Sequence, residues 1–557
     1  MTEKLTPREK LTQRWSALKS ERSSWDSHWR EVSDYLLPRS GRFMTSDVNN
    51  GGKRHNNIYD STATRSLRVL AAGMMAGMTS PARPWFRLAT ADMDLMQSDA
   101  VKLWLNQVTR QMLNIFARSN TYRALHGIYE ELGAFGTASS VMLNDFDTVV
   151  HHYPLTIGEY ALATDSRGRV NTLYREFEYT VAQMVAEFGI DKVSRHVKSL
   201  HDAGNLDAWI TVVHTIEPRL DRDPKLRDSK NMPFKSIYFE RAGEKEDVLR
   251  ESGFREFRGL CPRWAVSGGD VYGYSPGMEA LGDIRQLQHE QLRKAQGIDY
   301  KTKPPLQVPT ALKNQGVNTL PGGATYVDTA VANGGIRTAF ETQIDLSHLL
   351  ADIQDVRSRI SSAFYADLFL MLASAPVSNM TATEVAERHE EKLLMLGPVL
   401  ERLHNELLDP MVEMTFTAML EAGIVPPPPA ELQGQDINVE FVSMLAQAQR
   451  AVGTNSVDRF VGNLGAVAAI KPDVLDKFDS DKWADLYADM LGVDPELITA
   501  DDKVALVRQS RAQAQAAQAQ AAAMQQGADA ASKLGTVKTD ESNAANDIMS
   551  LFSGYNA

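Results

Sequence analysis

Apolar residues recur at three- and four-residue steps from Leu11 to Leu36, which places them on one face of an α-helix. Pro38 lies in the segment that follows and ends this helix. The same spacing predicts a second helix over residues 60–78 and a third over about 99–117. The chain is therefore expected to begin with helices.

Two glycines of the second predicted helix, Gly73 and Gly77, lie one helical turn apart. Glycine is unfavourable inside a helix unless its missing side chain leaves space that something else needs. We therefore expect another segment to pack closely against the backbone on this face.

Between residues 120 and 270 the pattern changes to short runs rich in β-branched and aromatic residues, which predict strands. The predicted strands are 138–143, 151–157, 170–177, 209–217 and 236–241. Helices near 121–133 and 180–189 accompany them. This region is therefore expected to be a mixed α+β fold.

Long helices return at residue 278, where apolar residues form a narrow stripe as far as 299 and the other faces are polar or charged. A helix of this length spans about 33 Å. A narrow stripe suits packing against neighbouring helices more than burial in one core. A Pro- and Gly-rich segment with short strand-like pieces, 301–341, follows, and another amphipathic helix is predicted from 345 to 370.

A loop without any charged residue follows the second long helix, at about 371–380. Its simplest interpretation is a connection between helices, and the alternative is a surface that lies against another molecule without gripping it. Thr381 and Glu384 form a capping box that predicts a further helix, continuing to about residue 420. Gly397 and Pro398 lie inside that helix, so a kink is expected there.

The consecutive prolines at 426–429 end this helical region. A strand-like run at 437–442 and helices up to about residue 510 follow. The stretch 511–526 is almost entirely Ala and Gln, which favour helices but build poor cores. We expect it to be a solvated helix or part of a ring of mutually packed helices, and the residues from 528 onward to be flexible.

With 557 residues, 43% of them hydrophobic, the chain can form several domains with sizeable cores. Its 59 basic and 71 acidic residues give a net charge of −12. Tight DNA binding normally needs a basic surface that neutralises phosphates, so any contact with DNA must be local, or repulsive by design. The single cysteine, Cys261, excludes an internal disulfide and fits assembly in a reducing cytoplasm. Neither a signal peptide nor a membrane-spanning run is visible, and the chain is expected to be soluble.

No motif for catalysis stands out, and the sequence has no P-loop. His151 and His152 are adjacent in a predicted strand and therefore point to opposite faces, so we do not expect them to bind one metal ion. His389 and Glu390 lack the second histidine of a zinc-protease helix, because Leu393 occupies its position. We expect no catalytic residues, no metal site and no cofactor.

Four segments, spread in order over residues 29–385, carry a resemblance to a known family. They are Trp29-Arg30-Glu31-Val32 with Tyr35-Leu36-Leu37-Pro38-Arg39; Tyr59-Asp60-Ser61-Thr62-Ala63 with Leu70-Ala71-Ala72-Gly73-Met74-Met75-Ala76-Gly77-Met78-Thr79-Ser80-Pro81 and Trp85-Phe86; Tyr272-Gly273-Tyr274-Ser275-Pro276-Gly277-Met278-Glu279-Ala280-Leu281-Gly282-Asp283; and Met380-Thr381-Ala382-Thr383-Glu384-Val385. With these segments the chain resembles the head-to-tail connector, or portal, family of short-tailed bacteriophages. None of them is a catalytic signature, so their order and spread matter more than any one of them.

The resemblance implies a mainly α fold with a mixed α+β wing, built as a ring subunit. Its implied parts are the wing (1–277), the first stem helix (278–300), the clip (301–344), the second stem helix (345–370), the tunnel loop (371–380), a kinked wing helix and its return (381–439), a crown with a helical extension (440–527) and a flexible tail (528–557).

The resemblance also implies a structural function, in which a ring of about twelve copies at one capsid vertex forms the channel for genome packaging and ejection. The tunnel loop would face double-stranded DNA without reading its sequence, through Ala373, Ser374, Ala375, Pro376, Val377, Ser378, Asn379 and Met380. Possible basic residues of the channel or stem are Arg285, Arg293, Lys294, Lys301 and Lys303. A ring of negatively charged chains would keep phosphates from adhering to its wall.

The implied partners are further copies of the chain, the terminase large subunit, a tail adaptor protein, and the major capsid and scaffolding proteins, with no membrane. The implied location is the portal vertex of the virion, after assembly in the host cytoplasm. One alternative is another structural protein of the virion, such as a tail or capsid subunit, although these are mostly β-rich. A packaging nuclease or ATPase is the other, and it would need a metal-binding carboxylate cluster or a nucleotide loop.

Overall fold

The computed structural model of the chain contains two compact units, residues 1–475 and 476–557. The residues that it describes are 6–43, 51–90, 92, 95, 98–223, 225–226, 228–242, 248–308, 310, 313, 317–318, 336–338, 347–373, 396–432, 434, 437–442, 457, 460–469, 471–491, 499 and 501–535.

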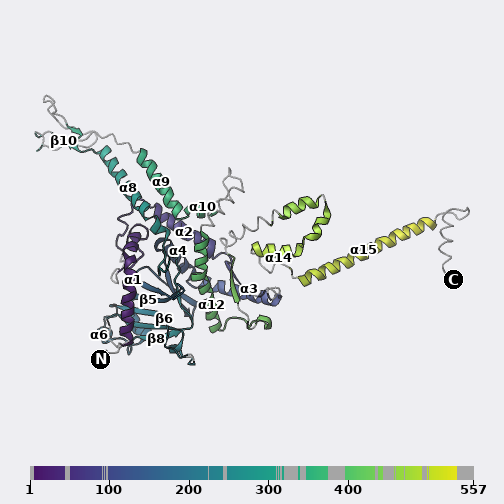
Figure 1. Cartoon of the computed structure of the whole chain (residues 1–557), viewed down its shortest axis with the longest axis horizontal. Coiled ribbons are helices and arrows are strands. Elements are labelled where there is room, and N and C mark those ends of the chain that lie inside the picture. The colour runs from purple at the N-terminus through teal and green to yellow at the C-terminus, as the bar shows by residue number, and fades with distance from the viewer. Residues whose placement is uncertain are drawn as a thin grey trace. The chain divides into compact units, whose positions relative to one another are not determined.

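Four helices begin the first unit (Figure 1): α1 (Pro7–Tyr35), α2 (Thr62–Met78), α3 (Asp99–Arg118) and α4 (Thr121–Phe135). The three helices predicted at the start of the chain, and the one predicted near 121–133, are confirmed. A capping box between Thr6 and Glu9 fixes the start of α1. Trp29 of α1 and Tyr129 of α4 are fully buried and belong to one core cluster.

An antiparallel five-stranded sheet follows in the order β4-β5-β6-β7-β8. Its strands are β4 (Tyr160–Thr164), β5 (Val170–Thr180), β6 (Trp209–Pro218), β7 (Phe234–Glu240) and β8 (Arg250–Phe254). Trp15 of α1 stacks on Tyr174 of β5 and packs with Val213 of β6, so α1 covers one face. The adjacent Val212 packs instead with Val181 of α5 (Val181–Phe188), which covers the other face together with α6 (Arg195–Asp202). The expected mixed α+β region is confirmed.

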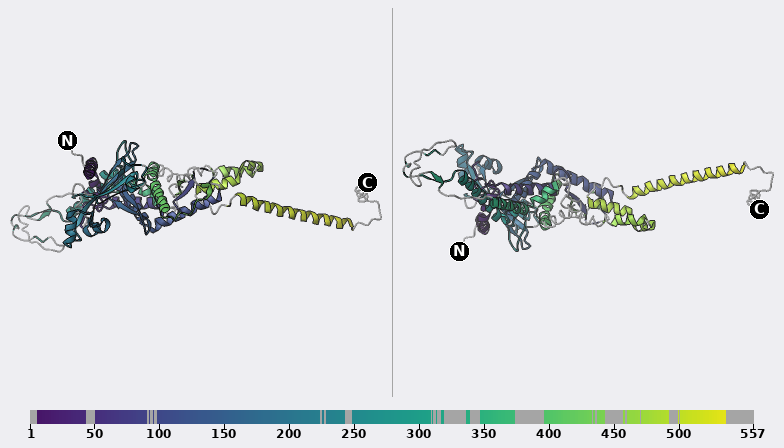
Figure 2. Two further views of the ribbon diagram at one scale, coloured as in Figure 1. Left: turned by 90° about the horizontal axis from the view of Figure 1, so that it is seen from below. Right: turned by 90° about the horizontal axis from the view of Figure 1, so that it is seen from above.

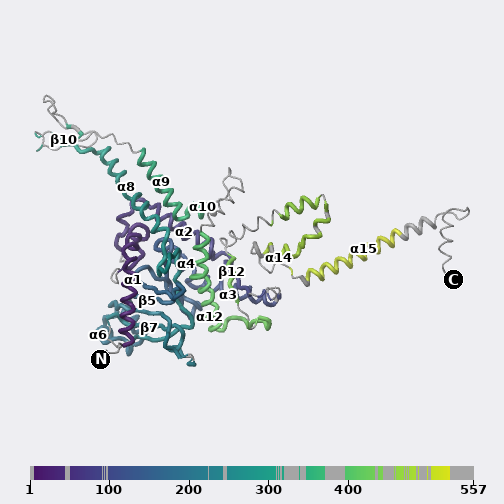
Figure 3. Tube along the Cα trace, viewed as in Figure 1, coloured from purple at the N-terminus to yellow at the C-terminus, as the bar shows by residue number. Residues whose placement is uncertain are grey.

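Two smaller sheets complete the body of the first unit. One has the order β3-β2-β9, with β2 (Ser139–Asp145), β3 (Val149–Leu155) and β9 (Gly259–Leu260). The other pairs β1 (Phe86–Thr90) with β12 (Ile437–Phe441), which is labelled in Figure 3, and Phe86 lies opposite Phe441. The strand predicted at 437–442 is confirmed, and β1, its partner early in the chain, was not predicted.

The long helices are α8 (Leu281–Thr302) and α9 (Ser347–Ala363), which lie side by side (Figure 1). A short helix, α7 (Pro276–Glu279), precedes α8. The prediction of one unbroken helix over 345–370 is wrong, because Tyr365 has a positive φ of 53° and separates α9 from α10 (Ala366–Ala373). Between the long helices, β10 (Leu306–Gln307) pairs with β11 (Arg337–Thr338), and most of the predicted clip lies outside the described residues.

A helical segment that starts within the described residues at 396 continues through a π-helical turn at His404–Leu408 into α12 (Asp409–Glu421). Pro410 explains the π turn, because proline has no N–H for the carbonyl four residues earlier, and that carbonyl belongs to Glu406. Gly397 and Pro398 are both helical, but the residues before 396 lie outside the described part, so the kink expected there stays a prediction.

The second unit contains α14 (Ser480–Leu491) and α15 (Asp501–Gly535), and Figure 2 shows α15 in yellow as one continuous helix. Almost all side chains described between 503 and 526 are exposed, which agrees with a solvated Ala- and Gln-rich helix. The helix continues to Gly535, so the boundary predicted at 527 falls inside it. Arg508 of α15 forms a bidentate ion pair with Asp481 of α14. Its Nη1 donates to Oδ2 at 2.6 Å, and its Nη2 donates to Oδ1 at 2.7 Å.

Candidate functional site at the base of the long helices

A loop from a distant part of the chain fastens α8 and α9 at their base. Asp60 in this loop has only 8% of its surface exposed. Its Oδ2 accepts hydrogen bonds from Nη2 and Nε of Arg357 on α9, at 2.7 and 3.1 Å, and from Nε2 of Gln291 on α8, at 2.8 Å. One carboxylate therefore joins both long helices to the body of the subunit.

A buried glutamine, Gln288 of α8, completes this arrangement. Its Oε1 accepts hydrogen bonds from the backbone N–H groups of Tyr59 and Asp60, at 2.7 and 2.8 Å, and its Nε2 donates to the Asp60 carbonyl at 3.0 Å. Buried polar groups are costly without partners, so these bonds fix both the side chain and the loop. We call Asp60, Gln288, Gln291 and Arg357 the Asp60 clamp.

The Asp60 carboxylate is held in its ionised form. Burial alone would raise its pKa, but hydrogen bonds from Thr62 and Arg357 outweigh burial and hold the pKa below its ordinary value. Thr62 donates to Oδ1 through its backbone N–H and its hydroxyl, at 2.9 and 2.6 Å. The Asp60 carboxylate is therefore ionised at neutral pH.

The basic residues predicted for the channel or stem lie along α8 or just beyond its end, but they do not form one cluster. They are Arg285, Arg293, Lys294, Lys301 and Lys303. Arg285 pairs with Glu31 of α1 at 2.7 Å. Lys301 and Lys303 are exposed at the far end of α8, about 24 Å from Arg285 at a rise of about 1.5 Å per residue. A contact between these residues and DNA stays a prediction.

The segment that leads to the predicted tunnel loop is anchored on α2. A Cβ atom placed on Gly73 would lie 2.2 Å from Cγ of Phe369 in α10, so the ring occupies the space that the glycine leaves. The close packing predicted at Gly73 is confirmed. The predicted loop, 371–380, begins inside α10, which ends at Ala373, and Ser374 to Met380 lie outside the described residues.

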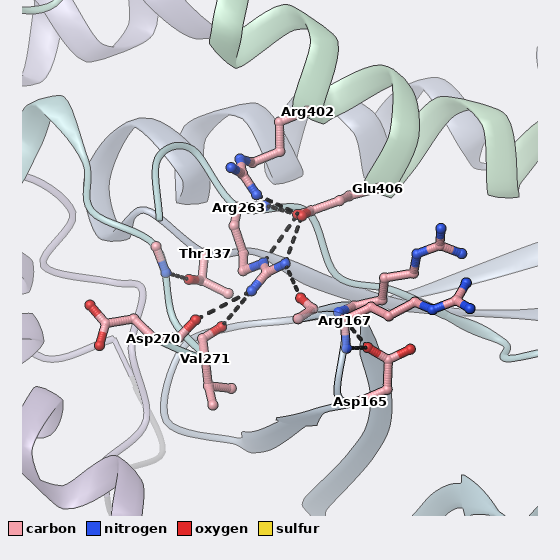
Figure 4. Close-up of polar contacts among 11 residues, drawn as sticks. Thr137, Asp165, Arg167, Arg263, Asp270, Val271, Arg402 and Glu406 are labelled. Carbon is pink, nitrogen blue, oxygen red and sulfur yellow. Dashed lines mark hydrogen bonds and ion pairs between the residues drawn. The ribbon is translucent and has the colours of Figure 1, made fainter. Parts of the chain in front are cut away.

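A buried arginine, Arg263, connects the π-helical turn to the turn between β4 and β5 (Figure 4). Its Nη2 donates to Oε1 of Glu406 at 2.7 Å, and its backbone N–H and Nε donate to Oε2 at 3.0 and 3.2 Å. The same Nη2 donates to the carbonyl of Gly168, in the turn between β4 and β5, at 2.8 Å. Arg402, one turn before Glu406, adds a bond to Oε1 at 3.1 Å. Arg263 therefore links Glu406, in the helix that follows the predicted tunnel loop, to the turn between β4 and β5.

The segment before α7 passes very close to the end of α4. A Cβ atom on Gly273 would lie 2.2 Å from the carbonyl oxygen of Gly136, and Gly136 has a left-handed φ of 75°. The Gly273 N–H donates to the Thr137 hydroxyl at 2.7 Å, and the Ser275 hydroxyl donates to the Ala134 carbonyl at 2.8 Å. These contacts explain why this segment needs glycine and serine.

Among the described residues, no group of His, Cys, Asp and Glu is placed to hold a metal ion. Burial lowers the pKa of His152 to about 4, whereas His151 is only half-buried, as expected for neighbours that point to opposite faces of a strand. His389 and Glu390 lie outside the described residues. No helix of the described part is long and apolar enough to cross a membrane.

Sequence analysis did not identify the residues of the clamp or the Arg263–Glu406 pair. In the sequence pattern Gln288 belongs to the polar and charged faces of the helix predicted over 278–299, but it is 4% exposed. One signal was available, because Gln288 follows Leu287 directly and Gln291 lies one turn later, at the edge of the apolar stripe. No comparable signal marks Arg263, because its partner is more than a hundred residues away.

A profile of the family described as "Bacteriophage head to tail connecting protein" matches residues 8–498, and the chain belongs to this family. Family members are structural proteins, which agrees with the expectation that the chain is not an enzyme.

The chain is 68% identical to the probable portal protein of Bordetella phage BPP-1 over 550 residues, which cover 99% of both chains. It is 46% identical to the portal protein of Salmonella phage epsilon15 over 544 residues, 98% of both chains. Solved structures with similarity include a chain of the native gene transfer agent virion, which is 11% identical with a TM-score of 0.35 and covers 83% of this chain and 99% of that one. Another is from the neck of the empty gene transfer agent particle, with 10% identity, a TM-score of 0.34 and coverage of 80% and 98%.

Proposed function

We propose that this chain is the portal subunit of a short-tailed bacteriophage and forms a ring at one capsid vertex. The observation that carries the proposal is the alignment, over nearly the full length of the chain, with two phage portal proteins at 68% and 46% identity. The Asp60 clamp fits this function, because two long helices that project from a body need a rigid base if they are to form a channel wall.

Exposed apolar residues on the outer halves of the long helices support assembly into a ring. Ile298 and Tyr300 of α8 are 42% and 57% exposed, and Leu350 of α9 is 46% exposed. The described residues of the same subunit do not bury these apolar side chains. Contacts with α8 and α9 of neighbouring copies would bury them. A ring of about twelve subunits is the stoichiometry that we propose.

DNA would pass through this ring during packaging and ejection without being gripped. The net charge of −12 per chain makes the ring strongly acidic, which repels phosphates from most of its surface. The uncharged segment from Ala373 to Met380 would come closest to the duplex, and the exposed Lys301 and Lys303 would give weak, salt-sensitive contacts. These contacts would involve the DNA backbone and would not read sequence.

The remaining partners follow from the same function. The clip, 301–344, would dock the terminase large subunit during packaging and a tail adaptor protein afterwards. The wing and crown would face the major capsid and scaffolding proteins. The subunit would assemble in the host cytoplasm and remain in the virion at the portal vertex.

Negative-stain imaging and mass photometry of the purified full chain test the ring. Rings with a central hole, with a mass near twelve times 61.7 kDa, are expected. A monomer, a fibre or a closed shell would contradict the proposal, and a fibre or shell would favour a tail or capsid subunit instead.

A further inference from the structure

The turn between β2 and β3 presents a phenylalanine entirely to solvent. Phe146 is the most exposed large apolar residue of the described chain, at 109% of the reference area for its type. Two other exposed apolar residues, Leu420 in α12 and Ile424 just after it, are 53% and 44% exposed. The Asn144 side chain holds the two elements together by donating to Glu421 at 2.7 Å. The exposed ring of Phe146 is therefore apolar surface that a partner subunit can bury.

The turn that carries Phe146 is rigid. Oδ2 of Asp145 accepts hydrogen bonds from the backbone N–H groups of Asp147 and Thr148, at 3.2 and 2.8 Å, and from the Thr148 hydroxyl at 2.8 Å. Val149 has a φ of 69°, a region that a β-branched residue rarely adopts and that costs free energy. The fold therefore maintains a strained, ordered turn whose tip is an exposed aromatic ring.

The other end of the same hairpin contains a cavity. It has a volume of about 190 Å³ and lies between α4 and the bases of β2 and β3. Its apolar lining comprises Gly127, Ile128, Ala138, Pro154 and Leu155, and its polar lining comprises Ser40, Glu130, Glu131, Ser139 and Thr156. A volume of about 150 Å³ is enough to hold a benzene ring, so the volume of this cavity suffices for a phenyl group, which would contact its apolar side.

Gly127 leaves this cavity open. A Cβ atom added there would meet no atom within 4 Å. Glycine inside a helix costs stability relative to other residues, and no close backbone contact within the described subunit requires it at this position. The absence of a side chain at Gly127 therefore keeps the cavity open.

We infer that Phe146 of one subunit inserts into the cavity at Gly127, Ile128 and Leu155 of the next subunit in the ring. A ring is built from heterologous contacts, in which two different patches of the same chain meet, and this hairpin carries one patch at each end. The tip and the base are six residues apart along β2, about 20 Å at the rise of a strand, so the ring of Phe146 cannot reach its own cavity. The inference rests on the proposed ring.

Cysteine cross-linking in the full-length chain tests the contact directly. The double variant Phe146→Cys/Gly127→Cys is expected to form a ladder of covalent oligomers under mild oxidation, because a disulfide needs Cα atoms within about 7 Å and only different subunits bring these positions together. The native Cys261 will not interfere, because it is buried and burial raises its pKa to about 12. The matched control is Leu220→Cys/Gly127→Cys, since Leu220 is 95% exposed on another loop, and it should give no ladder.

Assembly measurements provide a second readout. Phe146→Ala and Gly127→Leu, which fills the cavity, should each raise the protein concentration at which rings half-assemble by at least tenfold, whereas Leu220→Ala should not change it. Circular dichroism should show all three variants folded, because each site is exposed or open. Rings of the wild-type chain combined with no ladder and unchanged assembly of both variants would overturn the inference and leave the proposed function standing. A wild-type chain that stays monomeric would overturn both.

Discussion

The ring of Phe369 in α10 fills the space above Gly73 in α2, so closely that a Cβ atom on the glycine would lie 2.2 Å from the ring carbon Cγ. Phe369 is 5% exposed and lies four residues before the end of α10, where the described residues stop and the predicted tunnel loop begins. The packing of one phenyl ring against one glycine therefore fixes α10 on α2.

Gly73→Ala is expected to destabilise the subunit, although alanine is the better helix former. The added methyl must displace Phe369, and overpacking of this kind costs about 1–3 kcal/mol, more than the roughly 1 kcal/mol gained in helix propensity. Thermal unfolding followed by near-UV circular dichroism measures the loss. Gly282→Ala in α8 is the matched control, because a Cβ atom there meets nothing within 4 Å. Equal stability of the two variants would contradict the packing argument.

Asp60→Asn should loosen the base of both long helices. The variant keeps the shape of the side chain but removes the charge that Arg357 and Gln291 share, at a cost of about 2 kcal/mol for bonds to a charged group. Faster proteolysis of α8 and α9 is the expected sign. Because the folded pKa of Asp60 lies below its ordinary value of 3.8, the carboxylate contributes stability above that pH and loses it as the pH falls through the folded pKa. A variant whose stability at pH 7 equals that of wild type would refute the clamp.

Glu131 in α4 should make the wild-type subunit less stable as the pH rises. Burial raises its pKa to about 7, from 4.5 in an unfolded chain, although Thr156 and Ile157 donate to its carboxylate. For a raised pKa the contribution to stability is fully present below pH 4.5 and is lost as the pH rises through 7. Relative to Glu131→Gln, wild type should lose about 3 kcal/mol of unfolding free energy between these limits. Parallel stability curves for the two proteins from pH 4.5 to 8 would rule this out.

Glu406→Gln should be strongly destabilising, because it leaves the guanidinium of Arg263, which is 3% exposed, without its charged partner. Breaking a buried pair in this way costs about 3 kcal/mol. Arg402→Gln provides the control, since the Arg402 side chain is 34% exposed and its single bond to Glu406 should be worth less than about 1 kcal/mol. Chemical denaturation distinguishes the two variants, and equal midpoints would argue against Arg263 as the connection between the π turn and the β4–β5 turn.

Local patterns predicted much of this fold. The helices α1 to α4 and the strands β5 to β7 lie where apolar periodicity places them, because amphipathic faces are visible in any single segment. The break at Tyr365 was missed because the apolar stripe continues through it, and a backbone at positive φ leaves no mark on that stripe. The strand β1 was missed because its pairing with β12 joins segments that are far apart in the chain.

Some features of the functional site were likewise predictable from the local sequence, and others were not. The segment around Asp60 was singled out by resemblance, yet its contacts with Gln288 and Arg357 could not be foreseen, since both partners are more than two hundred residues away. Gly73 was predictable, because a glycine within a helix is itself a signal of close packing. Long-range polar contacts such as Arg263 with Glu406 depend on the complete fold and have no local pattern.

Asn379→Lys tests the proposed neutral loop, and it should impair genome packaging more than ring assembly. About twelve added positive charges around the channel would attract the phosphates of the passing duplex and slow its movement. The same substitution should leave the subunit contacts unchanged, so imaging should still show rings of normal size. Asn379→Gln adds bulk without charge and should package normally, which separates attraction from steric blockage. Because the attraction is electrostatic, higher salt in a packaging reaction should partly restore the lysine variant. Wild-type packaging by the lysine variant would remove the role proposed for residues 373–380.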